Sequence, residues 1–309
     1  MRNAFAAELS RLSQSHDNVI LMYGDIGNKL FDVYKEKNPG KSFNAGVAEA
    51  SMVGVAAGLA KKGFRPFVYT INSFLYLKAF EQIKLDVCYA NLPVVLVGTG
   101  SALSYSGLGS THHSLEDVGT LRTIPNLEIY APSSPGDIKD LIPYIYERGK
   151  PSYIRIGKKG ECDLELNYNR SISNDYFGPF VSEGKKSAQT LICCMGTIAE
   201  NVEKAIRIFD PSRQKISLAI FPQVAPINRD AVRRLMSDYR KCIIVEEHCS
   251  VGGLQSILME LSYGLSSSPI IETINIPLNF FVGLGETESA RQYLGLSVEE
   301  LVRKFNESA

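Results

Sequence analysis

The chain has 309 residues, of which 45% are hydrophobic and 21% charged, so it can bury sizeable cores and is long enough for two domains. It carries 33 basic and 33 acidic residues, a balance that provides no field to gather nucleic acid or an anionic membrane surface. No apolar run reaches the roughly 18 residues that are needed to span a bilayer, and the amino terminus lacks the apolar core of a signal peptide. We therefore expect a cytoplasmic, globular protein with no nucleic-acid or membrane partner.

The first half of the chain alternates apolar runs with helical stretches, which is typical of a parallel sheet covered by helices. The expected strands are residues 18–23, 65–70, 92–98, 126–132 and 151–156. Residues 161–187 are polar, rich in Gly, Asn and Ser, and show no sustained period. Such a composition indicates a linker between domains.

A second alternation of strands and helices follows this linker. Its expected strands are residues 189–196, 215–221, 242–248 and 270–276, with helices near 198–209 and 228–239. The six cysteines are scattered without a CxxC pair, which favours buried, reduced thiols. The sequence thus predicts an α/β protein of two consecutive domains, residues 1–160 and 188–309, each with a mainly parallel sheet covered by helices.

One carboxylate, Glu49, stands at the head of a run of small and apolar residues between the first two expected strands. At helical spacing it shares a face with Met52, Val53, Ala56 and Ala60. The position is compatible with two interpretations. Either Glu49 is a buried acid kept for chemistry, or it is a first-turn glutamate that the helix dipole favours and that reaches solvent.

Two long or glycine-punctuated segments, residues 23–29 and 98–117, follow the first and third expected strands. Ligands of parallel sheets bind beyond the carboxyl ends of the strands, so both segments are expected at a ligand-binding edge. The second segment brings His112 and His113 to the start of a helix that is expected near Ser114 or Leu115. Adjacent side chains diverge, so at most one histidine faces a given ligand, and their spacing does not fit a metal site.

In this order the segments resemble a known family. Residues 46–87, 92–142 and 151–160 are similar to the pyrimidine-binding domain of the transketolase family of thiamine diphosphate enzymes, and residues 242–261 are similar to its C-terminal domain. The resemblance covers nearly the whole chain. It is strongest to the separately encoded C-terminal subunit of split transketolases, with 1-deoxyxylulose-5-phosphate synthase as a close relative.

The resemblance implies a cofactor role for several side chains. Glu49 matches the glutamate that bonds ring nitrogen N1′ of the cofactor's aminopyrimidine and favours its imino tautomer. Phe74 matches the aromatic residue that lies against the pyrimidine, although a core position is the alternative. Long transketolases carry a further aromatic residue where Leu77 stands here, and Tyr76 and Phe80 are neighbouring candidates for that contact.

Other matching positions concern the substrate and the rim of the site. His112 matches a histidine that reaches substrate hydroxyls, and Asp25 matches an acidic rim residue, with a local turn contact as its alternative. Arg155 and Lys158 match basic positions and are candidates for anion contacts or ordinary surface charges. The phosphate-contacting histidine of long transketolases falls at about Gly100, so a sugar phosphate substrate does not follow from the match.

The family's diphosphate-binding motif is missing from this chain. Its GDG sequence, which holds Mg²⁺ together with a downstream Asn, does not occur here. The resemblance therefore implies an N-terminal partner subunit that holds Mg²⁺ and the diphosphate, in an α2β2 heterotetramer. The C-terminal domain would serve assembly, with Gly252 and Gly253 permitting tight packing.

The implied activity is that of a transferase of carbohydrate metabolism that is active only with its partner. It would move a two-carbon ketol unit from a ketose donor to an aldehyde acceptor, each a sugar or a sugar phosphate. Two enzyme alternatives are the beta subunit of a 2-oxo acid dehydrogenase and a deoxyxylulose phosphate synthase-like enzyme. An alternative of another class is a non-catalytic assembly or regulatory subunit.

Overall fold

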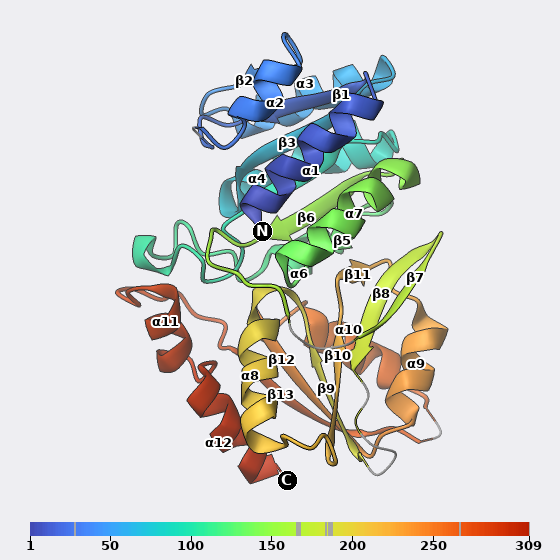
Figure 1. Cartoon of the computed structure of the whole chain (residues 1–309), viewed down its shortest axis with the longest axis vertical. Helices are drawn as coiled ribbons and strands as arrows, with labels where there is room; N and C mark the ends of the chain where they lie inside the picture. Colours follow the sequence, from blue (N-terminus) through green and yellow to red (C-terminus); the bar gives the residue numbers. More distant parts are fainter. Residues whose placement is uncertain (28, 165–167, 183, 185–187, 266, 309) are drawn as a thin grey trace.

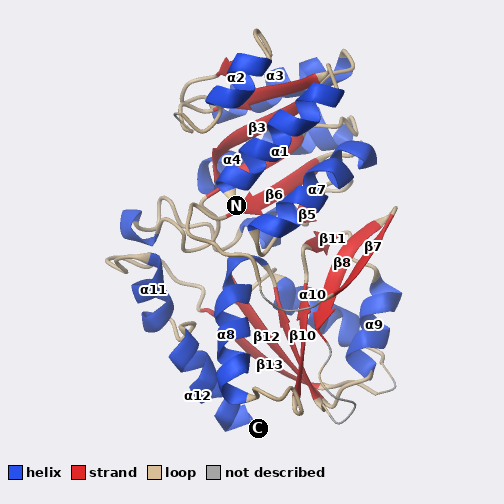
Figure 2. Cartoon of the chain, in the orientation of Figure 1, coloured by secondary structure: helices blue, strands red, loops and turns tan. Residues whose placement is uncertain are grey.

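The computed structural model describes residues 1–27, 29–164, 168–182, 184, 188–265 and 267–308. Figures 1 and 2 show two sheets, one above the other, each covered by helices. Within the described ranges, no helix is long and apolar enough to cross a membrane. All six cysteines are free thiols and five are buried, whereas Cys162 is exposed, unlike the prediction.

The first sheet has seven strands, in the order β11-β5-β6-β4-β3-β1-β2. Their bounds are β1 (Val19–Tyr23), β2 (Ser42–Asn44), β3 (Arg65–Ile71), β4 (Val95–Thr99), β5 (Glu128–Tyr130), β6 (Ser152–Ile156) and β11 (Gln223–Ala225). The strands β1 to β6 are parallel, as is usual for a sheet that helices cover on both faces, whereas β11 pairs antiparallel with β5. One face is covered by α1 (Arg2–Ser15), α2 (Asp32–Lys37) and α7 (Pro135–Arg148). The other face is covered by α3 (Glu49–Lys61), α4 (Asn72–Lys78), α5 (Phe80–Gln82), η1 (Ile83–Tyr89) and α6 (Asp117–Leu121).

The second sheet has six strands, in the order β13-β12-β9-β10-β8-β7. Their bounds are β7 (Asn169–Ser173), β8 (Tyr176–Ser182), β9 (Thr190–Cys194), β10 (Ile216–Ile220), β12 (Lys241–Cys249) and β13 (Ile270–Ile276). The four adjacent strands β13, β12, β9 and β10 are parallel to one another. The strands β8 and β7 continue the sheet in antiparallel pairing. The helices that pack on this sheet or beside it are η3 (Gly196–Ile198), α8 (Ala199–Phe209), α9 (Arg229–Ser237), α10 (Leu254–Ser262), α11 (Thr287–Tyr293) and α12 (Val298–Ser308). The predicted fold class, two mainly parallel sheets covered by helices, is confirmed.

Three local predictions differ from the structure. Residues 161–187, expected as a linker, contain β7 and β8 of the second sheet; β7 is an exposed edge strand without an apolar period, and a Gly-Pro pair interrupts the pattern of β8. The helix expected near Ser114 or Leu115 begins at Asp117. The short strands β2 and β11 were not predicted, because neither lies in an apolar run long enough to show a period.

The end of β12 and the turn after it pack closely against α6, on the first sheet. Gly252 lies so near Gly119 that a Cβ added at position 252 would sit 2.6 Å from the Cα of Gly119. Beside this contact, the backbone N–H of Gly119 donates to His248 Nε2 at 3.2 Å, and Arg122 pairs with Glu260 at 2.5 Å. The tight packing predicted for Gly252 is therefore present, and it fixes α6 against the second sheet.

Candidate active site

The helix α3 presents Glu49 from its first turn, at the carboxyl edge of the first sheet. Its side chain is 3% exposed and shares the buried face with Met52, Val53 and Ala56, as the helical spacing predicts. The interpretation of Glu49 as a solvent-reaching glutamate is therefore wrong. A buried carboxylate is costly unless another group pairs with it, so the partner of Glu49 has to be identified.

That partner is Lys78, on the exposed face of α4. The Lys78 Nζ lies 3.5 Å from Glu49 Oε2 and 4.3 Å from the centre of the Phe74 ring, one helical turn away. Leu77 lies on the same helix and is 56% exposed. Tyr76, a candidate for the contact with the pyrimidine, is fully buried in the core, so it cannot meet a ligand at this surface.

The loop after β4 adds two more rings, His112 against Phe74 and Tyr105 against His112. His112 meets Phe74 edge-on with ring centres 5.0 Å apart, and it meets Tyr105 at 5.9 Å. Beyond Tyr105, the ammonium of Lys158 lies 4.8 Å from the centre of its ring. Six side chains thus form one continuous set, which we call the site row: Glu49, Lys78, Phe74, His112, Tyr105 and Lys158.

The two adjacent histidines diverge, as predicted. Burial, with a smaller contribution from His113, lowers the pKa of His112 below its ordinary value, so His112 is neutral at pH 7. Its Nδ1 lies 2.9 Å from Thr111 Oγ1. His113 is buried on the other side of the loop, where its Nε2 lies 3.3 Å from the carbonyl oxygen of Ser106.

A buried polar network holds α4 against the histidine loop. The Asn72 amide, at the start of α4, donates to Ser114 Oγ at 2.7 Å and to Asp117 Oδ2 at 2.9 Å. The Tyr153 hydroxyl contacts Asp117 Oδ2 at 2.6 Å and also reaches Asn72 Oδ1. Only glycine fits at position 98, because any Cβ there would overlap the Asn72 amide. This buried network therefore sets the distance between Phe74 and His112.

Arg155 does not belong to the site row, contrary to its match with a substrate-contacting position. Its side chain is 4% exposed, and its Nε lies 3.3 Å from Asp117 Oδ2. Its Nη2 points at the carbonyl oxygen of Glu247 in the second sheet, at 3.5 Å. Because β6 directs Arg155 inward, its guanidinium balances the Asp117 carboxylate and contacts the second sheet, and it is not available to a substrate anion.

Asp25 lies at the same edge of the sheet but in a separate hydrogen-bonded group. Its residue has a left-handed backbone, with φ of 53°, and its side chain is exposed. The backbone N–H of Asp25 donates to Asn44 Oδ1 at 3.0 Å, and Asn44 Nδ2 donates back to Asp25 Oδ1 at 3.2 Å. These contacts tie Asp25 to β2, 19 residues further along the chain, so they are not those of a local turn, and the rim role of Asp25 stays a prediction.

Sequence reasoning missed two members of the site row, Lys78 and Tyr105. The first was detectable, because Lys78 follows Phe74 by four residues on a helix and so shares its face. The second lies in a loop without a period. Gly100, with φ of 78°, leaves the space that the Tyr105 ring fills, and any Cβ at position 100 would overlap that ring.

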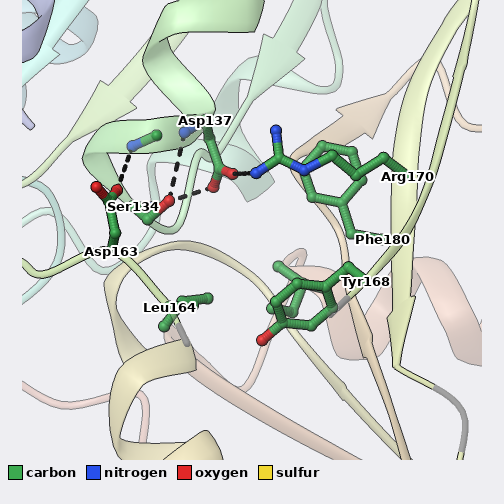
Figure 3. A pocket seen from close by; sticks show the side chains of 9 residues that line it. Ser134, Asp137, Asp163, Leu164, Tyr168, Arg170 and Phe180 are labelled. Atoms are coloured by element: carbon green, nitrogen blue, oxygen red, sulfur yellow. Dashed lines mark hydrogen bonds and ion pairs between the residues drawn. The ribbon is translucent and has the colours of Figure 1, made fainter. Parts of the chain in front are cut away.

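Another cavity, of about 300 Å³, lies at the amino end of α7 and is shown in Figure 3. The charged side chains that line it are paired with other lining residues. Arg170 pairs with Asp137 at 3.5 Å, and Asp163 accepts from the backbone N–H of Gly136 at 2.5 Å. The Ser134 hydroxyl caps the helix by accepting from the backbone N–H of Asp137 at 3.3 Å. These groups stabilise a helix end, and the cavity contains no residue of the site row.

Comparison with known proteins places this chain in a family. The model of the transketolase pyrimidine-binding domain matches residues 1–160. The chain belongs to the transketolase family. It is 31% identical over 265 residues to one subunit of an apulose-4-phosphate transketolase from Actinobacillus succinogenes, a match that covers 85% of this chain and 83% of the relative. It is 28% identical over 314 residues to a putative transketolase C-terminal section of Methanocaldococcus jannaschii, covering 99% and 95%.

A solved transketolase has the same fold. Its structure, described as a split-gene transketolase in an inactive beta4 tetramer, superimposes with a TM-score of 0.81 at 23% identity, covering 99% of this chain and 96% of that one. The two relatives confirm the resemblance to the separately encoded C-terminal subunit of a transketolase, and the solved structure confirms the fold. This member of the transketolase family therefore carries the site row at the carboxyl edge of the part that matches the pyrimidine-binding domain.

Proposed function

We propose that this chain is the catalytic C-terminal subunit of a thiamine diphosphate-dependent enzyme that transfers a two-carbon ketol unit from a ketose to an aldehyde. The observation that carries the proposal is the site row. A buried carboxylate, a half-buried aromatic ring and a neutral imidazole come from three separate segments and meet at one edge of the sheet. A non-catalytic subunit would have no need to keep these three groups together.

The residues present fit the aminopyrimidine half of the cofactor. The Glu49 carboxylate lies just beneath the half-exposed Lys78, so a ligand that displaces this ammonium reaches the carboxylate. Phe74 is half-buried and offers a ring face at the same point. A flat heteroaromatic ring with a basic nitrogen needs these two contacts, one polar and one apolar.

The diphosphate half of the cofactor does not find its ligands in this chain. Among the described residues, no group of three or more His, Cys, Asp or Glu side chains could hold a metal ion. The sequence also lacks the GDG motif. We therefore assign Mg²⁺ and the diphosphate to an N-terminal partner subunit, in an α2β2 assembly. Two similar proteins, one named as a single subunit of a transketolase and one as a split-gene transketolase, support such a division for those proteins.

The chain's own residues act on protons and orientation. Thiamine diphosphate supplies, when bound, a thiazolium carbon that adds to a carbonyl and an electron sink for C–C cleavage. Glu49 holds a proton at N1′ of the pyrimidine through a charge-assisted hydrogen bond, which burial strengthens. Phe74 fixes the plane of that ring. His112, neutral at pH 7, exchanges protons with substrate hydroxyls and with the oxygen that gains charge.

The outer end of the site row defines the class of substrate. Lys158 provides a half-buried ammonium beside Tyr105, and this cation takes the anion-binding role that Arg155 and Gly100 cannot fill. A sugar phosphate would place its phosphate at Lys158 and its hydroxyls at His112. One relative's name specifies apulose 4-phosphate, which is a compound of that chemical class.

The first test is calorimetry of the purified chain with thiamine diphosphate and Mg²⁺. An aromatic contact and one charge-assisted hydrogen bond contribute about 2–4 kcal/mol, which barely offsets the loss of ligand freedom. We expect millimolar or weaker binding by the chain alone and tight binding after a GDG-bearing partner is added. Micromolar binding by the isolated chain would contradict the division between two subunits.

The second test addresses Glu49. Glu49→Gln keeps the shape of the side chain but removes the carboxylate that holds the proton at N1′, so we expect it to abolish exchange of the thiazolium C2 proton in the reconstituted complex. The exposed Glu81, on the neighbouring α5, provides the control Glu81→Gln, which should exchange at the wild-type rate. Unchanged exchange in Glu49→Gln would remove Glu49 from its assigned role.

A further inference from the structure

Lys78 engages, in the free chain, both groups that the proposed function assigns to the aminopyrimidine. We propose that Lys78 is an internal occupant of the pyrimidine site, which neutralises Glu49 and covers Phe74 until the cofactor's ring displaces it. This inference rests on the proposed function. It adds a residue that the resemblance does not assign, and it gives that residue a definite change of position.

The distances support a single position with two contacts. The Nζ atom lies 3.5 Å from Glu49 Oε2 and 4.3 Å from the centre of the Phe74 ring. The ammonium therefore stands where a ring stacked on Phe74 would present a basic nitrogen to Glu49. A cation and an aminopyrimidine cannot occupy that place together.

Burial shows which partner depends on the other. Glu49 is 3% exposed, whereas Lys78 is 49% exposed. A carboxylate buried to this degree needs a counter-charge, and the Lys78 ammonium supplies it from the solvent side. The lysine itself loses little when it moves, because it is half exposed and its long, flexible stem lets the ammonium return to water.

The neighbouring charges of the same segment do not share this geometry. Lys84 lies on η1 and is exposed. Lys61, in the last turn of α3, is exposed at the end of the helix opposite to Glu49. Lys78 is thus distinguished by its position, one turn after Phe74, and it provides a matched comparison with these surface lysines.

The first experiment follows Lys78 directly by NMR, in the full chain with isotope-labelled lysine. The ring current of Phe74 should shift the Lys78 side-chain resonance upfield from those of exposed lysines, and Lys78→Arg identifies that signal by its loss. Titration with hydroxymethylpyrimidine, the pyrimidine half of thiamine, should return the signal to the exposed-lysine position. A Lys78 resonance that stays in place while other signals show that the pyrimidine binds would overturn the inference.

The second experiment measures the affinity for hydroxymethylpyrimidine in three variants. Lys78→Ala removes the occupant and should bind roughly 5- to 30-fold more tightly than the wild type, the range expected from loss of a competing ion pair and a cation–π contact. Lys78→Arg keeps the charge and should bind like the wild type, as should the control Lys84→Ala. Equal or weaker binding by Lys78→Ala would show that the lysine is not a competitor.

The outcomes separate this inference from the function on which it rests. If the wild type binds the pyrimidine and Lys78→Ala binds it no better, the function stands and the inference is wrong. If neither the free chain variants nor the complex with a GDG-bearing partner binds the pyrimidine or the whole cofactor, the proposed function is wrong, and the inference falls with it.

Discussion

Replacing Asn72 with aspartate tests the buried network that sets the distance between α4 and the histidine loop. The Asn72 amide donates to Ser114 at 2.7 Å and to Asp117 at 2.9 Å, and it lies directly against Gly98. The new side chain has the same shape and no room to turn away. Asn72→Asp therefore brings a second carboxyl group within hydrogen-bond distance of Asp117.

The magnitude follows from the protonation that this pair requires. Two carboxylates in contact cannot both stay ionised in a buried site, so one of them must hold a proton. An aspartate in the unfolded chain has a pKa of about 3.9, so holding that proton at pH 7 costs about 4 kcal/mol of folding free energy. The folded pKa of the pair is raised above the unfolded value, so the cost is absent at low pH and grows as the pH rises. At pH 5 the same calculation gives about 1.5 kcal/mol.

The assay is urea unfolding of wild type and Asn72→Asp at pH 5 and pH 7. Asn91→Asp makes the same chemical change at an exposed position and serves as the control, with little expected effect at either pH. A destabilisation of Asn72→Asp that is equal at the two pH values, or below about 1 kcal/mol at pH 7, would refute the network as described.

Three further predictions concern pH, packing and catalysis. Burial raises the pKa of Glu246 to about 7, above its unfolded value, so the wild type should lose about 2.5 kcal/mol between pH 5 and pH 8 that Glu246→Gln does not lose in urea titrations. Gly252→Ala places a Cβ 2.6 Å from the Cα of Gly119 and should be about 1–3 kcal/mol less stable to thermal unfolding than Gly264→Ala, which has a similar φ but open space. His112→Ala should lower turnover of the reconstituted complex by about 10²-fold while cofactor affinity is retained. A larger loss of turnover in His113→Ala would assign the proton-exchanging role to His113 instead.

The periodic patterns of the sequence determined the elements that build the site. Parallel strands that are buried on both faces appear as continuous apolar runs, so β1, β3, β4 and β6 were predicted with small shifts at their ends. The same reasoning placed Glu49 on one helical face with Met52, Val53 and Ala56, because helical spacing is a local property, but it left open whether the carboxylate reaches solvent. A local period also explains why the two histidines were expected to diverge.

Elements without a period were beyond that reasoning. The strands β2 and β11 have three residues each, and β7 is polar and exposed at a sheet edge. What defines β11 is its pairing with β5, nearly a hundred positions earlier in the chain, as the partners Gln223 and Tyr130 show. Such a strand exists because of its partner and not because of its own residues.

The tertiary structure alone decided which charged and aromatic side chains meet. Arg155 has the sequence context of an anion contact, yet the inward face of β6 directs it to Asp117. Lys78 reaches Glu49 from 29 residues away, and Tyr105 enters the space that Gly100 leaves open. These contacts depend on how segments that follow different strands dock at one edge of the sheet. Residue propensities and periods act over a few neighbours, so they place each side chain on its element but not the elements against each other.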